Sequence, residues 1–146
     1  MGEIINIRTL TASGLLRLPS PVVICSNKNI FYDAITESGY SVTSLNFSLA
    51  KKLAGLPEQE IQRTTPTAAQ ELLTVYPQIY LKDYEILFDP RYQLDVLRMF
   101  VDLSRRIKLI VKWCGKIENN FLIYAEQGFA DFKRYNINDY EITVVK

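Results

Sequence analysis

The sequence feature that most constrains the fold is a short apolar run, residues 21–25 (PVVIC), followed at once by a polar loop. Its β-branched residues favour a strand, and residues 30–35 after the loop have the apolar spacing of a helix. Strand, loop and helix in this order are the setting of phosphate-binding loops. This loop, Ser26-Asn27-Lys28-Asn29, contains no glycine, and Asn29 follows Lys28 where a metal-coordinating hydroxyl is expected. We therefore predict a vestigial phosphate-loop position on a nucleotide-binding scaffold, without hydrolysis of nucleotide.

Length and charge narrow the class of protein. A chain of 146 residues predicts a single domain, and a net charge of +1 gives no electrostatic case for nucleic acid or membranes on its own. No apolar run approaches the ~20 residues of a membrane span. The first residues lack the basic and then apolar layout of a signal peptide. We expect a cytoplasmic protein with no membrane partner.

The available side chains exclude several kinds of active site. The chain has no histidine, which rules out an imidazole base, a histidine-containing triad and histidine metal ligands. The two cysteines, Cys25 and Cys114, are far apart in sequence and form no CxxC pair of the kind that binds zinc. We expect both to be reduced thiols buried at the ends of strands, and we expect no metal and no cofactor.

The order of predicted elements indicates an α/β fold. The apolar patterns, prolines and glycines predict helices over residues 3–17, 30–38, 48–56, 65–77 and 89–106, with strands over 21–25, 40–45, 78–81 and 107–113. After residue 115 the pattern predicts a β-hairpin over 116–125 that turns at Asn119-Asn120, and short strands over 133–135 and 141–145. We therefore predict one domain, 1–146, with an α/β core over 1–115 and a β-rich C-terminal appendage over 116–146.

Five segments of the chain resemble a known family. They are 45–53 (LNFSLAKKL), 84–90 (YEILFDP), 103–106 (LSRR), 113–115 (WCG) and 124–128 (YAEQG). In this order and spacing they resemble the BrxF proteins, small P-loop-containing proteins of the type 3 bacteriophage exclusion (BREX) systems. The resemblance implies a P-loop-NTPase-like parallel sheet flanked by helices, here with a short antiparallel tail, and a place in bacterial phage defence.

The chain departs from that family pattern at both nucleotide motifs. The glycine-rich Walker A loop is replaced by the loop at 26–29, and the Walker B acidic position at the end of the strand over 78–81 holds Lys82. Asp83 comes one place later, and Glu85 follows it. A lysine repels the magnesium ion that a carboxylate would hold. Lys82, Asp83 and Glu85 thus form a degenerate Walker B region, and both departures argue against ATP hydrolysis.

Two charged groups admit a functional and a structural interpretation. Asp83, Glu85 and Asp89 form an acidic cluster at a strand end, the usual place of active sites in parallel sheets, but Asp89 also suits the cap of a helix. Residues 98–116 are the most basic part of the chain. The basic residues are Arg98, Arg105, Arg106, Lys108, Lys112 and Lys116. They would suit either weak contact with a nucleic-acid backbone or a solvated edge.

The leading functional hypothesis is a non-catalytic, ATPase-like subunit that binds other proteins of a defence system or a second copy of itself. Aromatic residues are dense around the acidic segment and in the C-terminal region, as in protein interfaces, although packing inside the fold would also use them. One alternative is a diverged ATPase that still binds nucleotide through Lys28 and Arg105. The other is a nucleic-acid-binding accessory factor.

Overall fold

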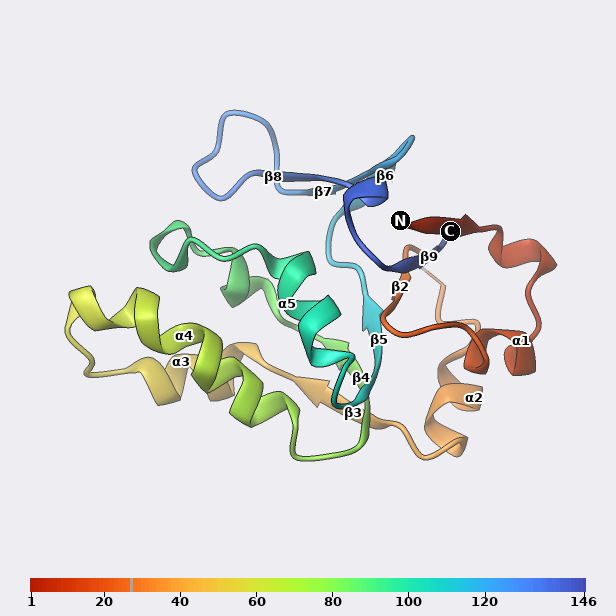
Figure 1. The fold of residues 1–146 in the computed structure, drawn as a ribbon, viewed down its shortest axis with the longest axis horizontal. Coiled ribbons are helices and arrows are strands. Elements are labelled where there is room, and N and C mark those ends of the chain that lie inside the picture. Colours follow the sequence, from red (N-terminus) through yellow and green to blue (C-terminus); the bar gives the residue numbers. More distant parts are fainter. Residues whose placement is uncertain (27) are drawn as a thin grey trace.

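The fold is built on a six-stranded sheet whose strands are all parallel, in the order β1-β9-β2-β5-β4-β3 (Figure 1). The structure is a computed structural model, and it describes residues 1–26 and 28–146. The strands are β1 (Glu3–Ile5), β2 (Val22–Ile24), β3 (Ser41–Ser44), β4 (Gln78–Lys82), β5 (Lys108–Lys112) and β9 (Thr143–Val145). The α/β class and the parallel sheet predicted from the sequence are confirmed.

Helices cover both faces of this sheet. α1 (Ala12–Leu16) and α2 (Tyr32–Glu37) lie on one face, and α3 (Asn46–Leu53), α4 (Glu58–Leu73) and α5 (Val96–Leu103) lie on the other (Figure 1). Alternate residues of the central strands point to opposite faces, so Ile24 joins the core under α1 and α2 while Val23 joins the core under α3, α4 and α5. Burial on both faces explains the unbroken apolar runs of β2 and β5.

The C-terminal antiparallel strands form a separate three-stranded sheet. β6 (Lys116–Glu118), β7 (Phe121–Tyr124) and β8 (Lys133–Asn136) pair in the order β6-β7-β8. The predicted hairpin turn is confirmed, and Asn119 adopts the left-handed conformation there, at φ 51°. Gly115 allows the chain to cross tightly between the sheets, because a Cβ atom at this position would lie 1.9 Å from the carbonyl oxygen of Ile123.

The last strand differs from the prediction. Residues 141–145 were expected in the β-rich appendage, but β9 lies between β1 and β2 in the main sheet, with Val144 beside Val23 and Ile4. Thr143, Val144 and Val145 are all buried, which is typical of an inner strand of a parallel sheet. The apolar alternation that predicts a strand does not specify its partners, so its place in the sheet was missed.

The predicted helix over residues 3–17 is wrong at its start. Glu3–Ile5 forms β1, which pairs with β9 at the sheet edge, and a short 3₁₀ turn, η1 (Ile7–Thr9), follows. The true helix, α1, begins after Thr11, whose hydroxyl oxygen accepts a hydrogen bond from the Gly14 N–H at 3.0 Å. Pairing with β9 therefore outweighs the weak helical pattern of these residues.

Three other helix starts also differ. Pro66 lies inside α4 instead of opening a helix, and α3 begins at Asn46 without a cap from Ser48. The Asp89-Pro90 pair opens only a 3₁₀ turn, η3 (Pro90–Tyr92), and α5 begins later, after Asp95, whose carboxylate accepts from the Arg98 N–H at 3.1 Å. The remaining short turns are η2 (Glu85–Phe88) and η4 (Ile137–Asp139). Among the described residues, no helix has the length and apolar character needed to cross a bilayer.

Candidate functional site

The carboxyl ends of the parallel strands form the candidate site. The chain leaves β2 for β3, which lies three places away on one side, whereas after the neighbouring strand β5 it passes through the three-stranded sheet and returns to β9, on the other side of β2. Open α/β sheets bind their ligands beyond the carboxyl ends of the strands at such a change of direction. Ile24, the last residue of β2, lies beside Lys112 of β5 and Val145 of β9, so these three strands end at one level.

The described residues of the loop after β2 form two local hydrogen bonds. The Lys28 N–H donates to the hydroxyl oxygen of Ser26 at 3.1 Å, so this amide is used within the loop. The carbonyl oxygen of Asn29 accepts from the Tyr32 N–H at 3.3 Å. α2 then spans only six residues and has no side-chain cap. Asn27, the second residue of the predicted vestigial loop, lies outside the described residues.

The segment over residues 82–85, predicted as a degenerate Walker B region, connects the ends of β3 and β4. Asp83 has a left-handed backbone, at φ 49°, and its carboxylate accepts a hydrogen bond from the Ser44 hydroxyl at 2.9 Å. Its carbonyl oxygen also accepts from the N–H groups of Leu45 and Asn46, at 3.0 and 2.8 Å. These bonds satisfy the first amides of α3 and replace the cap that was expected from Ser48. Asp83 therefore contacts β3, on the side of β4 that faces away from β2.

Buried groups fill the space beyond β4 and β5. The Tyr84 side chain is fully buried, and its hydroxyl donates to the carbonyl oxygen of Lys112 at 2.8 Å. Burial raises the pKa of this hydroxyl well above its ordinary value. Cys25 and Cys114 are free and partly buried after β2 and β5, and burial raises the pKa of each thiol to about 12. Both thiols are therefore protonated at neutral pH, which makes them poor nucleophiles.

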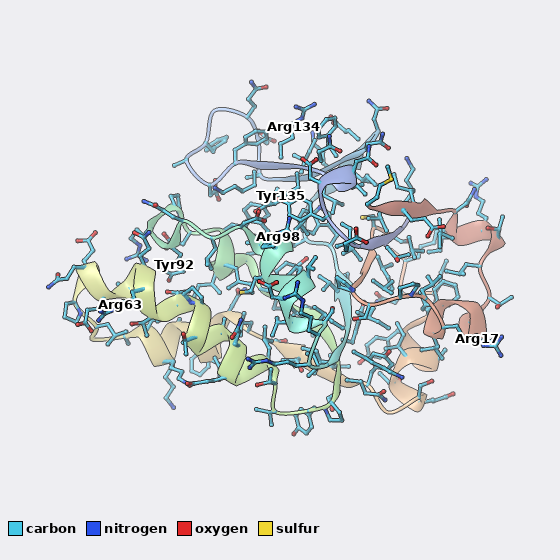
Figure 2. The ribbon with its side chains drawn as sticks, in the orientation of Figure 1. Arg17, Arg63, Tyr92, Arg98, Arg134 and Tyr135 are labelled. Carbon is cyan, nitrogen blue, oxygen red and sulfur yellow. The ribbon has the colours of Figure 1, made fainter. Side chains whose placement is uncertain are left out.

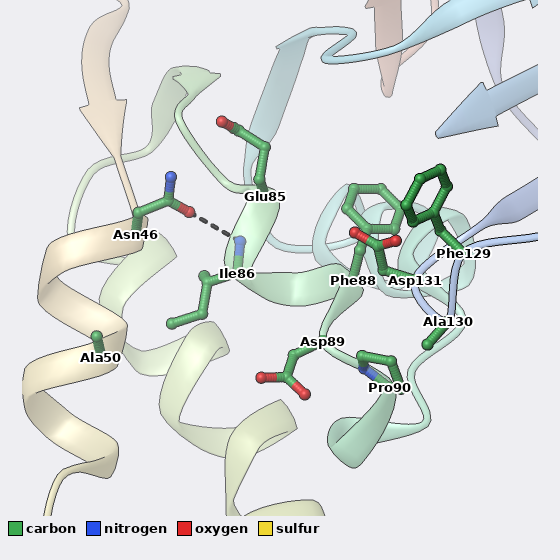
Figure 3. Close-up of a pocket in the computed structure, with 10 residues that line it drawn as sticks. All are labelled: Asn46, Ala50, Glu85, Ile86, Phe88, Asp89, Pro90, Phe129, Ala130 and Asp131. Carbon is green, nitrogen blue, oxygen red and sulfur yellow. Dashed lines mark hydrogen bonds between the residues drawn. The ribbon is translucent and has the colours of Figure 1, made fainter. Parts of the chain in front are cut away.

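Two of the three predicted acidic residues line an open cavity of about 760 Å³ beside α3 (Figure 3). Glu85 and Asp89 contribute to its lining, and Asp131, from the loop between β7 and β8, adds a third carboxylate. Asp89 caps the 3₁₀ turn η3, where the cap of a helix over 89–106 was predicted, and pairs with the Arg91 guanidinium at 2.7 Å. Hydrogen bonds from Arg91 lower the pKa of the Asp89 carboxyl. Among the described residues, no group of three or more cysteine, aspartate or glutamate side chains is arranged so that it could hold a metal ion.

The basic residues over 105–112 lie at opposite ends of β5, an inner strand of the sheet. Arg105 and Arg106 lie in the turn before β5, where Arg105 is 3.9 Å from the Asp102 carboxylate. Lys108 begins β5 and is exposed, whereas Lys112 ends it, is partly buried and lines a cavity of about 230 Å³. The two ends of this strand are ~13 Å apart. Nucleic-acid binding by these residues stays a prediction.

Arg98 has a packing role of its own. It projects from α5 below β8 and its Tyr135 side chain (Figure 2). The guanidinium lies 5.0 Å from the ring centroid of Tyr140 and donates to the carbonyl oxygen of Asp139 at 3.3 Å. These contacts hold α5 against the segment that leads into β9.

Eight of the 17 aromatic residues are buried, and five more are partly buried. Tyr80, Tyr84, Tyr92 and Tyr135 are buried, and the predicted core residue Trp113 is buried as well. Four aromatic residues are exposed: Tyr32, Phe47, Tyr76 and Phe129. Phe129 is 64% exposed and lines the wall of the cavity. About half of the aromatic residues thus belong to the core.

Sequence reasoning missed two residues that shape the cavity. The side-chain oxygen of Asn46 accepts from the Ile86 N–H at 2.9 Å and fixes α3 against η2. Its signal was available, because asparagine favours helix starts. Asp131 carries no such signal, because the fold of the β7–β8 loop brings it to the cavity.

The comparisons with known proteins gave no relative: no protein-family model, curated protein or solved structure matches this chain. The resemblance to the BrxF family therefore stays a prediction.

Proposed function

We propose that this chain is a non-catalytic, ATPase-like subunit that acts by binding other proteins in a phage-defence assembly of the BREX type. The observation that carries the proposal is that polar groups at the strand ends, where a nucleotide would bind, form hydrogen bonds within the protein. The Lys28 amide bonds to Ser26, Asp83 bonds to Ser44, and the Tyr84 hydroxyl bonds to the Lys112 carbonyl group. The Lys28 amide and the Asp83 carboxylate, which would face a magnesium nucleotide, thus already have hydrogen-bond partners within the protein.

The strand order supports the ATPase-like part of the proposal. With β1 set aside as an edge strand, the order is β9-β2-β5-β4-β3, so one strand separates β2 from β4. This is similar to the arrangement of P-loop ATPases in which the two motif strands flank a third strand. The degenerate loop and the degenerate acidic region follow these two strands. The phage-defence setting depends on the sequence resemblance alone.

Two measurements test the proposal. Calorimetry with ATP and magnesium is expected to detect no binding in the micromolar range, because the loop sequence lacks the length and the glycines to enclose a β-phosphate. A micromolar or tighter dissociation constant would favour a diverged ATPase instead. Light scattering of the chain mixed with the products of adjacent genes is expected to show a complex. A monomer that binds none of them contradicts the protein-binding role.

A further inference from the structure

The cavity beside α3 is part of a longer groove. A second cavity, of about 360 Å³, shares Ala50, Ile86 and Asp89 with it and continues between α3 and α4 toward Leu56. The floor is largely apolar, because Ile86, Phe88 and Pro90 face it. An elongated, apolar-floored groove suits a segment of polypeptide better than a compact small molecule.

The groove is also acidic. Glu85 and Asp131 line it, and neither forms an ion pair among the described residues. The charge of Asp89 is offset by Arg91, so two uncompensated carboxylates remain. The whole chain has a net charge of only +1, so this is a local concentration of negative charge. It repels phosphate groups and attracts lysine or arginine.

Contacts within the fold hold the groove open before any partner binds. The Phe88 and Tyr124 rings stack with centroids 3.9 Å apart, which fixes the three-stranded sheet to the groove floor. In the loop that carries Phe129, its N–H donates to the carbonyl oxygen of Glu126 at 3.2 Å, and the Phe132 N–H donates to that of Phe129 at 3.1 Å. A preformed site loses less conformational entropy on binding.

We infer that this groove binds an amphipathic segment of another protein, one that carries apolar side chains and at least one lysine or arginine. Phe129 stands on the wall with 64% of its surface exposed, as an aromatic anchor for that segment. The basic residue of the partner pairs with Glu85 or Asp131. The groove is thus the contact site for the protein-binding role proposed above, and it depends on that role.

Photo-crosslinking in the cells that naturally produce the chain tests this site. A benzophenone amino acid replaces Phe129 in one full-length protein and Tyr76 in another; Tyr76 is 53% exposed and lies at the opposite edge of the sheet, before β4. We expect position 129 to crosslink to a segment of another protein with apolar and basic residues. A crosslink at 129 to an acidic segment, to nucleic acid or to a second copy of the chain overturns the inference.

Charge substitutions identify the electrostatic contribution. Glu85→Gln with Asp131→Asn is expected to lower the crosslink yield at 129 by about fivefold. The matched control, Asp33→Asn with Glu37→Gln on the exposed face of α2, is expected to change it by less than about twofold. Equal yields in the two double variants overturn the inference. Thermal unfolding of both confirms that they are folded.

The outcomes also separate the groove from the proposed function. Crosslinks at position 76 without any at 129 would retain the protein-binding role and reject the groove. An absence of crosslinks at both positions would reject the groove, and light scattering with the adjacent gene products then decides the protein-binding role independently.

Discussion

The ring of Phe88 stacks on the ring of Tyr124, with centroids 3.9 Å apart and planes inclined by 9°. Phe88 ends η2, just beyond β4, whereas Tyr124 ends β7 in the three-stranded sheet. Trp113 adds an edge-to-face contact with Phe88, at 5.9 Å between centroids. The two sheets are thus joined by aromatic packing next to the acidic groove.

Replacement of Tyr124 tests this junction. Tyr124→Ala removes the stacked ring and is expected to lower the free energy of unfolding in urea by about 2 kcal/mol. Phe129→Ala is the matched control, because that ring is mostly exposed, and it is expected to change stability by less than about 0.5 kcal/mol. Equal effects of the two substitutions would contradict a structural role for the stacked pair.

Gly115 offers a second test of the same junction. In Gly115→Ala the new Cβ would meet the backbone oxygen of Ile123 at 1.9 Å, and a backbone atom cannot move aside cheaply. We expect a loss of about 3 kcal/mol in unfolding free energy. Gly128→Ala adds a Cβ in open space at φ +100°, so only backbone strain of about 1–2 kcal/mol is expected. A smaller loss for Gly115→Ala than for Gly128→Ala would show that the sheets separate easily.

The sequence predicted the elements better than their partners. The run of Val22, Val23 and Ile24 predicted a strand, and the structure confirms it; all three residues are buried, as in an inner strand of a parallel sheet. β9 has the same character, but strand order depends on contacts between distant segments that no local pattern encodes. Pro66 shows a related limit. Its missing N–H suggests a helix start, yet packing of Ala68, Ala69 and Leu73 keeps α4 continuous through it.

The candidate site was predicted only in part, for the same reason. Glu85 and Asp89 follow β4 in sequence, so the position of the strand alone places them near its carboxyl end. Asp131 and Phe129 reach the same groove through the docking of the three-stranded sheet. That docking depends on tertiary contacts such as the Phe88–Tyr124 stack, which sequence spacing does not reveal.

The two partly buried thiols, Cys25 and Cys114, predict a loss of stability at high pH. Burial raises the pKa of Cys25 and Cys114 from 9.0 to about 12, so above pH 9 the unfolded chain loses protons that the folded protein keeps. This stability is fully present below pH 9 and is lost as the pH rises toward 12. Each thiol contributes a slope of at most ~1.4 kcal/mol per pH unit. Urea unfolding under reducing conditions is expected to show a shallower decline for Cys25→Ala than for the parent, and identical slopes would contradict the prediction.

Substitutions of Arg98 and Arg106 distinguish a role in packing from a role in nucleic-acid binding. Arg98 is held by Tyr140 and Asp139, so Arg98→Ala is expected to lower the unfolding free energy by about 1 kcal/mol. Arg106 is exposed, and Arg106→Ala is expected to leave the unfolding free energy within about 0.5 kcal/mol of the parent.

Titration of a labelled duplex at two salt concentrations is expected to show weak binding that falls steeply with salt, and that weakens further in Arg106→Ala. Tight binding at the higher salt would favour a nucleic-acid-binding factor.

Substitutions of Asp83 test whether this carboxylate stabilises the fold or binds a metal ion. Asparagine tolerates the left-handed backbone and its side-chain oxygen can accept from the Ser44 hydroxyl, so Asp83→Asn is expected to keep the unfolding free energy within about 0.5 kcal/mol. Asp83→Ala loses the hydrogen bond and keeps the strained φ, so a loss of about 2 kcal/mol is expected. Ser44→Ala should lose about 1 kcal/mol, and less in the Asp83→Ala background, where the bond is already absent. Additive losses would show that the two side chains act independently. If the parent instead binds ATP with magnesium and Asp83→Asn loses that binding, this carboxylate is a metal ligand, because the substitution keeps the side-chain shape and removes its charge.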